Sequence, residues 1–492
     1  MEFSSYVFLF LFLPVFLILF FLTRKEARNL FLLFASLIFY AWGEGDYVLV
    51  LLISIVANQI FGSLVDKTKG GALKKTLFIA AVVFNLGLLV VFKYATFILQ
   101  NLGLSGPAKA IHSPLGISFF TFQALSYLID IYRKTVVNDR HPFRFALYMA
   151  FFPKLATGPI LPYHDFSKQI SSPEARKSDL SPGIQRVIIG LGKKILIADG
   201  VAKTANQIFA LPVEHQTAAL AWLGIICYSL QIYFDFSGYS DMAIGLGRIC
   251  GFRLPENFNY PYFSKSVKEF WTRWHISLAQ WLRDYLFLPI AYSMLRRIKR
   301  DRLLGIQAED WSYYTAAFFT FLICGIWHGA NWTFVIWGLF FGALLIIEHA
   351  GLKKLMKRRA PFIRLFYTQL MVIIAWVFFR SESPAYALSY LRAMFGFGGG
   401  NGGLFYPALY LNAELLFFMI IGIAFSFPII PSMKKRLEKR IEQLQNKGKK
   451  LESLIMDFGT TVLCNLYLIA VLLISIVYMI AGTYNPFIYF KF

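Results

Sequence analysis

Long apolar runs recur along this chain, and they constrain its fold more than any other feature. The runs cover residues 6–22, 30–42, 47–65, 76–98, 115–132, 143–161, 184–199, 217–234, 313–328, 333–350, 362–379, 411–431 and 455–481. A helix of about 20 apolar residues crosses a bilayer, and shorter runs suit half-helices or tilted packing elements. Because 57% of the 492 residues are hydrophobic and only 15% are charged, we predict an all-α polytopic membrane protein.

Basic segments between the runs predict the topology. They lie at Arg24–Arg28, Lys67–Lys75, Arg296–Arg302, Lys353–Arg364 and Lys434–Lys450. Short basic loops stay in the cytoplasm, so this pattern accounts for the net charge of +22 better than nucleic-acid binding does. The acidic turn Gly43–Asp46 and the Gly-rich stretch Gly396–Gly403 are expected on the opposite side.

The chain is expected to form a single membrane domain, residues 1–492. The first run lacks a preceding basic region and a small-residue cleavage site, which favours a retained span over a signal peptide. No internal repeat is visible, which disfavours an inverted-repeat transporter. Residues 433–451 read as a basic amphipathic helix, which we expect on the membrane surface rather than at a dedicated partner site.

The middle third, from Phe252 to Arg302, departs from a plain helical bundle. Prolines and charges interrupt its apolar residues too often for simple spans. Irregular backbone at membrane depth is tolerated only where it lines a cavity or is buried in protein. Amphipathic or re-entrant helices are therefore expected here.

Within this region, the stretch Phe270–Tyr285 predicts one amphipathic helix. At 3.6 residues per turn, the polar stripe comprises Arg273, Ser277, Gln280 and Asp284. His275 points away from the stripe, among Trp271, Leu278 and Leu282. Considered without other evidence, a histidine in this position is interpreted as a core residue whose imidazole is hydrogen-bonded to a carbonyl. A second histidine in an apolar region, His328, favours a functional role for the pair.

His328 is predicted to sit at a helix end, because Gly329, Ala330 and Asn331 follow it. Trp327 and Trp332 make its surroundings apolar, which suits a neutral imidazole acting as a general base. The alternative is a helix-capping histidine. Cys324 lies one turn earlier on the same helical face. It could form a nucleophile pair with His328, or it could be an inert packing residue, as buried free cysteines usually are.

Two further clusters contain buried polar groups. Asp235 and Asp241 follow an apolar run, where an internal hydrogen-bond network is favoured over a metal site. Lys154 lies inside an apolar run and needs a partner or an aqueous path. The four cysteines have no paired spacing, and neither a Walker A loop, a dinucleotide fingerprint, a nucleophile elbow nor a zinc-protease motif is present.

These motifs together resemble the membrane-bound O-acyltransferase superfamily, in its bacterial alginate and peptidoglycan O-acetyltransferase branch. The blocks that carry the resemblance, with the most diagnostic part at 114–350, are Pro114–Arg133, Phe151–Pro159, Gln231–Gly247, Pro255–Leu288, Trp327–Trp337, Trp376–Ser381 and Asn485–Phe492. The resemblance implies a ring of about 11–13 transmembrane and re-entrant helices around a central funnel.

The resemblance also assigns roles. The histidine of Trp-His-Gly, His328, corresponds to the catalytic one, and His275 to the second functional histidine. The residues expected to support the tunnel are Trp327, Asn331, Trp274 and Asp284. An acyl group, expected to be acetyl, passes from a cytoplasmic thioester, either acetyl-CoA or an acyl carrier, to a hydroxyl outside. No metal and no tightly bound cofactor are implied.

Family resemblance further places the protein in the bacterial cytoplasmic membrane. There it implies an exported SGNH-type acceptor protein that modifies a polysaccharide. The alternatives are a D-alanyl transfer protein of teichoic-acid modification, a secondary transporter or flippase, and a non-catalytic scaffold. An already activated thioester needs no ATP site, which agrees with the missing motifs.

Overall fold

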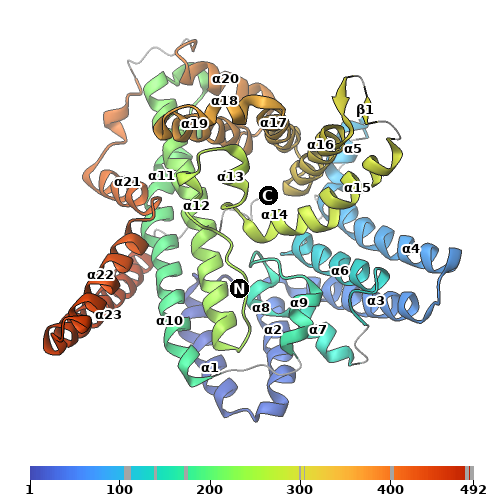
Figure 1. Cartoon of the computed structure of the whole chain (residues 1–492), viewed down its shortest axis with the longest axis horizontal. Helices are drawn as coiled ribbons and strands as arrows, with labels where there is room; N and C mark the ends of the chain where they lie inside the picture. The colour runs from blue at the N-terminus through green and yellow to red at the C-terminus, as the bar shows by residue number, and fades with distance from the viewer. Residues whose placement is uncertain are drawn as a thin grey trace.

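A computed structural model describes residues 1–104, 112–137, 141–170, 176–298, 301–303, 305–398, 404–482 and 487. Helices dominate it (Figure 1). In the described part, the strands are β1 (Arg302–Leu303) and β2 (Ile306–Gln307), which pair antiparallel. Parts of the Gly396–Gly403 loop and of the C-terminal block Asn485–Phe492 lie outside the described residues.

The helices follow the chain in this order. The first half contains α1 (Leu13–Leu22), α2 (Arg28–Glu44), α3 (Val48–Lys67), α4 (Gly71–Leu89), α5 (Ala95–Asn101), α6 (Ile117–Tyr132), α7 (Pro142–Ala150), α8 (Phe152–Leu155), α9 (Tyr163–Ile170), α10 (Lys177–Gly192), α11 (Asp199–Phe209) and α12 (Ala218–Ile249). The second half contains α13 (Val267–Trp271), α14 (Ile276–Leu282), α15 (Leu288–Arg297), α16 (Ala308–His328), α17 (Trp332–Ile347), α18 (Lys353–Lys357), α19 (Pro361–Arg380), α20 (Pro384–Met394), α21 (Ala413–Phe425), α22 (Ile429–Asn446) and α23 (Lys450–Ile480). Short π- and 3₁₀-helical segments are η1 (Val7–Phe12), η2 (Lys25–Ala27), η3 (Gly45–Tyr47), η4 (Val90–Tyr94), η5 (Lys193–Ala198), η6 (Val213–His215), η7 (Pro261–Phe263), η8 (Arg283–Phe287), η9 (Glu348–Leu352) and η10 (Pro407–Leu409).

Six described helices are long and apolar enough to cross a membrane, or seven if the bent pair α21–α22 is counted as one span. This confirms the all-α polytopic prediction. Several predicted boundaries are wrong, however. The run at 143–161 forms two short helices, α7 and α8, and the run at 217–234 is only part of the 32-residue α12.

Helix α12 continues past residue 234 because ion pairs neutralise its carboxylates. Asp235 lies 3.1 Å from the Nζ of buried Lys194, and Asp241 pairs with Arg186 and Lys193, each at 2.6 Å. The predicted polar network therefore exists as ion pairs to α10 and η5. A buried charge is tolerated when it is paired in this way.

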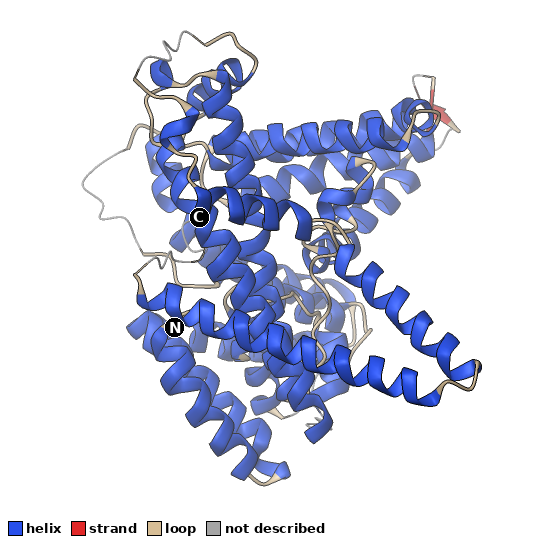
Figure 2. Cartoon of the chain, turned by 90° about the vertical axis from the view of Figure 1, so that its left-hand side faces the viewer, coloured by secondary structure: helices blue, strands red, loops and turns tan. Residues whose placement is uncertain are grey.

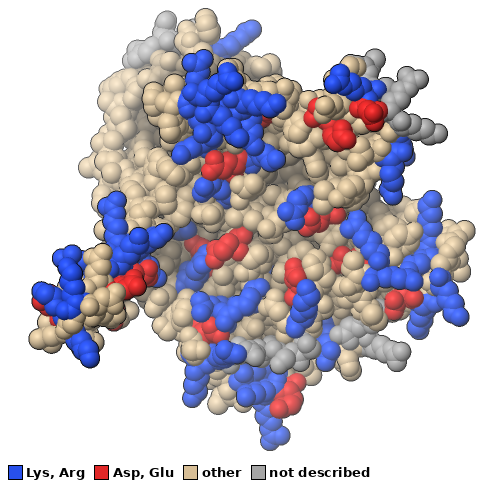
Figure 3. Space-filling view, viewed as in Figure 1, with Lys and Arg blue, Asp and Glu red and all other residues tan. Residues whose placement is uncertain are grey.

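Helices α22 and α23 lie side by side and extend beyond the rest of the molecule (Figures 1 and 2). α22 covers most of the predicted basic helix at 433–451, and its axis bends by 57° from that of α21. Lys and Arg side chains gather along this pair and around α18 on the face shown in Figure 3. That α22 rests on the membrane surface stays a prediction.

The middle third is broken into short helices, as its composition predicts. Figure 1 shows α13 and α14 enclosed by α12, α16, α17 and α19. The backbone NH groups of Val267 and Lys268, at the start of α13, donate to the carboxylate of Glu348. This contact anchors the broken segment to the end of α17.

Helices α16 and α17 pack with almost no space between their backbones. A Cβ atom on Gly325 would lie 2.4 Å from the carbonyl oxygen of Phe334, and one on Gly338 would lie 2.3 Å from that of Phe321. Real Cβ atoms do not approach so closely, so glycine is required at this crossing. The close approach positions the end of α16, where His328 lies.

Candidate active site

His328 is the last residue of α16, as predicted, and Gly329 adopts an extended backbone after it. Its side chain is buried, with 5% of the residue exposed. The imidazole centroid lies 4.8 Å from the rings of both Trp327 and Trp337, and 5.2 Å from that of Phe379. An aromatic shell of this kind excludes water from the imidazole.

Lys93 fixes the end of this helix, although it is not among the site residues predicted from the sequence. Its ammonium donates to the carbonyl oxygens of Trp327 at 2.9 Å and His328 at 3.1 Å. It also donates to the Ser118 hydroxyl at 3.3 Å. The last carbonyls of a helix have no partner within the helix, and a cation there also complements the helix dipole.

The neighbouring Tyr94 donates its hydroxyl to the carbonyl of Ile326 at 2.7 Å. Segment η4 thus satisfies three successive carbonyls at the end of α16. The signal for Lys93 was present in the sequence: a lysine inside the apolar run 76–98, which is the same signal that singled out Lys154. Such a lysine requires a specific partner.

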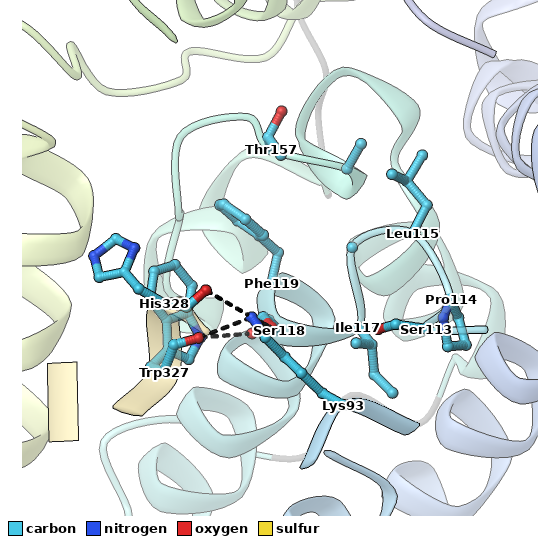
Figure 4. A pocket seen from close by; sticks show the side chains of 12 residues that line it. Lys93, Ser113, Pro114, Leu115, Ile117, Ser118, Phe119, Thr157, Trp327 and His328 are labelled. Carbon is cyan, nitrogen blue, oxygen red and sulfur yellow. Dashed lines mark hydrogen bonds between the residues drawn. The ribbon is translucent and has the colours of Figure 1, made fainter. Parts of the chain in front are cut away.

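A cavity opens beside His328 and Lys93 (Figure 4). Its volume is about 90 Å³, enough for several waters or a small group. Residues that line it are Lys93, Ser113, Pro114, Leu115, Gly116, Ile117, Ser118, Phe119, Ala156, Thr157, Trp327 and His328. The predicted site residues Trp327 and His328 and the newly found Lys93 therefore meet at one cavity.

His275 corrects the predicted geometry. Phe270–Tyr285 is not one helix: α13 ends at Trp271, and α14 begins at Ile276. His275 lies between them with φ +42°, a left-handed conformation that is rare outside glycine. The predicted polar stripe therefore does not exist as a continuous face. His275 is nevertheless fully buried, as predicted.

Contacts with Asn257 hold this strained residue in place. The carbonyl of Asn257 accepts from the NH of Ile276 at 2.9 Å. Its side-chain Oδ1 accepts from the backbone NH of Ser277 at 3.2 Å. Because these contacts come from a segment 18 residues earlier, periodicity within 270–285 could not reveal the break.

The same contacts determine the tautomer of His275. The Ser277 NH can only donate, so the Asn257 atom that it meets is the oxygen. His275 Nδ1 lies 3.1 Å from that oxygen and must therefore carry the proton. Its Nε2 then presents a lone pair, and no described residue hydrogen-bonds to that atom.

The Trp327 indole lies near both histidines. Its ring centroid is 6.5 Å from that of His275 and 4.8 Å from that of His328. Phe122 stacks on the indole at 5.0 Å with an interplanar angle of 13°. The indole is therefore packed against Phe122, and both imidazoles lie near it.

The other predicted supporting residues have distinct positions. Trp274 is buried among aromatic rings, 4.8 Å from Trp376. Asn331 caps α17: its side chain accepts from the NH of Thr333 at 3.0 Å. Asp284 pairs with Arg283 at 2.8 Å, and its side chain is 43% exposed. Asp284 therefore belongs to the surface, whereas Trp327 lies near both imidazoles and Trp274 directly precedes His275 in the chain.

The surroundings of Cys324 and Lys154 indicate structural roles for both residues. Cys324 is fully buried one turn before His328. The Lys154 ammonium donates to the carbonyl of Tyr148 at 2.5 Å and lies 4.0 Å from the centroid of that residue's ring. A backbone carbonyl and an aromatic ring thus supply the partners that this intramembrane lysine requires.

Helix ends on the side opposite the basic segments are joined by hydrogen bonds. The Glu44 carboxylate accepts from the NH of Leu115 at 2.9 Å, and the Trp332 indole donates to Asn101 at 3.0 Å. α16 starts after the basic segment near residue 300 and ends at His328, on this opposite side. The cavity beside His328 therefore lies toward the side that the charge pattern assigns to the exterior.

Several known proteins are similar in sequence to this chain, over parts of it or over its whole length. The MBOAT, membrane-bound O-acyltransferase family, matches residues 34–386. A probable alginate O-acetylase of Pseudomonas putida is 37% identical over 100% of both chains. A peptidoglycan O-acetyltransferase of Helicobacter pylori is 33% identical over 81% of this chain and 80% of its own. A teichoic acid D-alanyltransferase of Bacillus subtilis is 32% identical over 49% of this chain and 60% of its own. A buried histidine at a helix end, in a chain with at least six candidate spans and this similarity, leads to one conclusion: the chain belongs to the membrane-bound O-acyltransferase family and is a multi-pass membrane O-acyltransferase.

Proposed function

We propose that this enzyme passes an acetyl group from a cytoplasmic thioester to a hydroxyl acceptor outside the cytoplasmic membrane, for O-acetylation of a polysaccharide. The observation that carries the proposal is the pair of buried histidines whose imidazoles both lie near Trp327, with His328 at the edge of a cavity on the side that the charge pattern assigns to the exterior. Similarity to alginate and peptidoglycan O-acetyltransferases over most of the chain supports acetyl as the group.

In the proposed reaction, His328 accepts the proton of the acceptor hydroxyl, whose oxygen attacks the thioester carbonyl. The new C–O bond forms, the C–S bond breaks, and the departing sulfur takes the proton from the imidazolium. Thus the base is regenerated and no net charge is left in the site. The aromatic shell limits hydrolysis by excluding water, and binding both reactants in one site supplies proximity.

His275 is proposed to assist His328, since both imidazoles lie near Trp327. Its Nδ1 proton is committed to Asn257, so Nε2 is free to contact the donor or a bound water. Acetyl-CoA and an acyl carrier thioester both satisfy this scheme. The acceptor hydroxyl is proposed to belong to an exported SGNH-type protein, which hands the acetyl group to the polymer.

The test uses the purified chain in lipid nanodiscs with acetyl-CoA and a hydroxyl acceptor. Acyl transfer releases free thiol and acetylated acceptor in equal amounts. A transporter would move intact solute across vesicles without releasing thiol, and a scaffold would do neither. Failure to release thiol with either CoA or carrier thioesters would contradict the proposal.

D-Alanyl transfer remains the second candidate. The relevant relative aligns with only 49% of this chain, whereas the alginate O-acetylase aligns with all of it. Supplying a D-alanyl thioester beside the acetyl thioester in the same assay distinguishes the two donors.

A further inference from the structure

The hairpin of α22 and α23 presents basic and apolar side chains that the proposed chemistry does not use. It extends beyond the rest of the molecule (Figures 1 and 2), so other described parts of the chain leave much of its surface uncovered. Eight basic and two acidic residues lie between Lys434 and Lys450, and basic side chains line the hairpin in Figure 3. The charge pattern assigns this end of the two helices to the cytoplasmic side.

The apolar side of α22 faces α23. The two helices pack against each other. Leu444 of α22 is buried, and Leu437 and Ile441 are half-buried. Because these residues are spaced at three and four, they share one helical face. Protein therefore covers the apolar face of α22, and any apolar contact of the hairpin with a bilayer must come from another face.

The first turns of α23 supply such a face. Apolar residues there recur at spacings of three and four, are each between 63% and 72% exposed, and form one stripe: Leu451, Leu454, Ile455 and Phe458. The same helix continues as a candidate membrane span. Its 31 residues give a length of about 46 Å, whereas the apolar core of a bilayer is about 30 Å thick. The stripe therefore extends the apolar surface of the span into the headgroup region.

The exposed face of α22 is basic. Pairs of exposed cations at a spacing of four lie on it: Lys435 with Lys439, and Arg436 with Arg440. Among the described residues, the ion pairs within the hairpin are Lys434–Glu438 at 3.8 Å and Lys449–Glu452 at 2.7 Å. The two pairs of cations therefore have no carboxylate partner there. Cations beside an exposed apolar stripe complement anionic headgroups above acyl chains.

We propose that the α22–α23 hairpin binds anionic phospholipids of the cytoplasmic leaflet, with the α22 cations at the phosphates and the α23 stripe among the acyl chains. The inference does not depend on the proposed function. An acidic carrier protein would also complement the charge, but it would not account for an apolar stripe that continues a membrane span. Figure 1 shows α10 and α12 between the hairpin and α14, which begins directly after His275. A carrier on the hairpin would therefore be remote from the histidines.

The experiment titrates phosphatidylglycerol or phosphatidylcholine into the full-length protein in detergent and counts bound lipids by native mass spectrometry. The wild-type protein is expected to bind phosphatidylglycerol selectively, and less of it at higher ionic strength, because salt screens exposed charges. The combined variant Lys435→Gln, Arg436→Gln, Lys439→Gln, Arg440→Gln should lower the affinity for phosphatidylglycerol at least about tenfold. Leu454→Asn combined with Phe458→Asn should weaken the binding of both lipids.

The matched control removes four exposed charges from α18 and the residue that follows it, on the same face of the molecule: Lys353→Gln, Lys354→Gln, Lys357→Gln and Arg358→Gln. This control should keep the selectivity, and a Tm near the wild-type value shows that each variant is folded. An equal loss in the control would indicate a general effect of net charge and overturn the inference. So would equal binding of the two lipids by the wild type, unchanged binding by either set of folded hairpin variants, or an acidic carrier protein that binds α22 where the lipids do not.

Discussion

His275 donates its Nδ1 proton to the side-chain oxygen of Asn257 across 3.1 Å. This contact orients an imidazole whose backbone is in a left-handed conformation. Strain of this kind persists only where surrounding contacts fix it, and it concentrates at functional sites. The contact gives His275 a defined tautomer and leaves a buried Nε2 lone pair to which no described residue donates a hydrogen bond, which simple core packing does not require.

Replacing His275 by Gln should therefore lower the rate of acyl transfer by about 10²–10⁴-fold, the usual cost of losing a base or orienting group. Folding should be retained, because glutamine can keep a donor toward Asn257. Thiol release and Tm are to be measured on the same sample. A fall in Tm that accounts for all the lost activity would make His275 a core residue.

Lys93→Met should lower the rate by up to about 10²-fold, because the end of α16 loses its clamp and His328 shifts. The carbonyls of Trp327 and His328 would also lose their donors, so Tm should fall. Lys75→Met, an exposed lysine on α4, the helix that precedes η4, is the control and should change neither quantity. Full activity of Lys93→Met would show that the clamp does not position His328.

The histidine at the helix end could be predicted from sequence, whereas the geometry of the other histidine could not. Gly329 and Asn331 are local stop and cap signals, and the structure uses both in that way. The break before His275 depends on Asn257, so it is a tertiary effect that overrides helical periodicity. Lys93 carried a readable signal, but the two carbonyls of α16 that it holds lie more than 200 residues away.

The apolar pattern predicted the class of fold but not each helix. The runs at 143–161 and 217–234 are both predicted to be spans, yet one breaks at Phe151 and the other continues to Ile249. The second continues because its carboxylates meet lysines and an arginine on neighbouring helices. Pairing across helices is not encoded in the local sequence.

Cys324→Ser should keep most of the activity. The thiol is fully buried in the packing of α16, and buried free cysteines are usually inert. The variant is to be compared with wild type in the thiol-release assay and by Tm. A folded but inactive Cys324→Ser protein would restore the thiol-nucleophile mechanism.

Stability should depend on pH through His164, on the short helix α9. Its hydrogen bond to Asp130, at 3.1 Å, raises the pKa of this imidazole above its ordinary value of 6.5. A pKa raised by folding stabilises the protein fully below the unfolded pKa, and the gain is lost as pH rises through the folded pKa. The Tm difference between wild type and His164→Gln should therefore be largest below about pH 6.5 and shrink above it. A difference that grows with pH would contradict this assignment.

The most direct test of the account is acyl transfer by His328→Ala, measured as thiol released from the acetyl thioester in nanodiscs. We predict loss of transfer by about 10²–10⁴-fold or more, with unchanged membrane insertion. The control His349→Ala removes a partly exposed histidine paired with Asp310 at 2.8 Å and should retain the wild-type rate. Transfer near the wild-type rate by His328→Ala would contradict the central claim that His328 is the catalytic base.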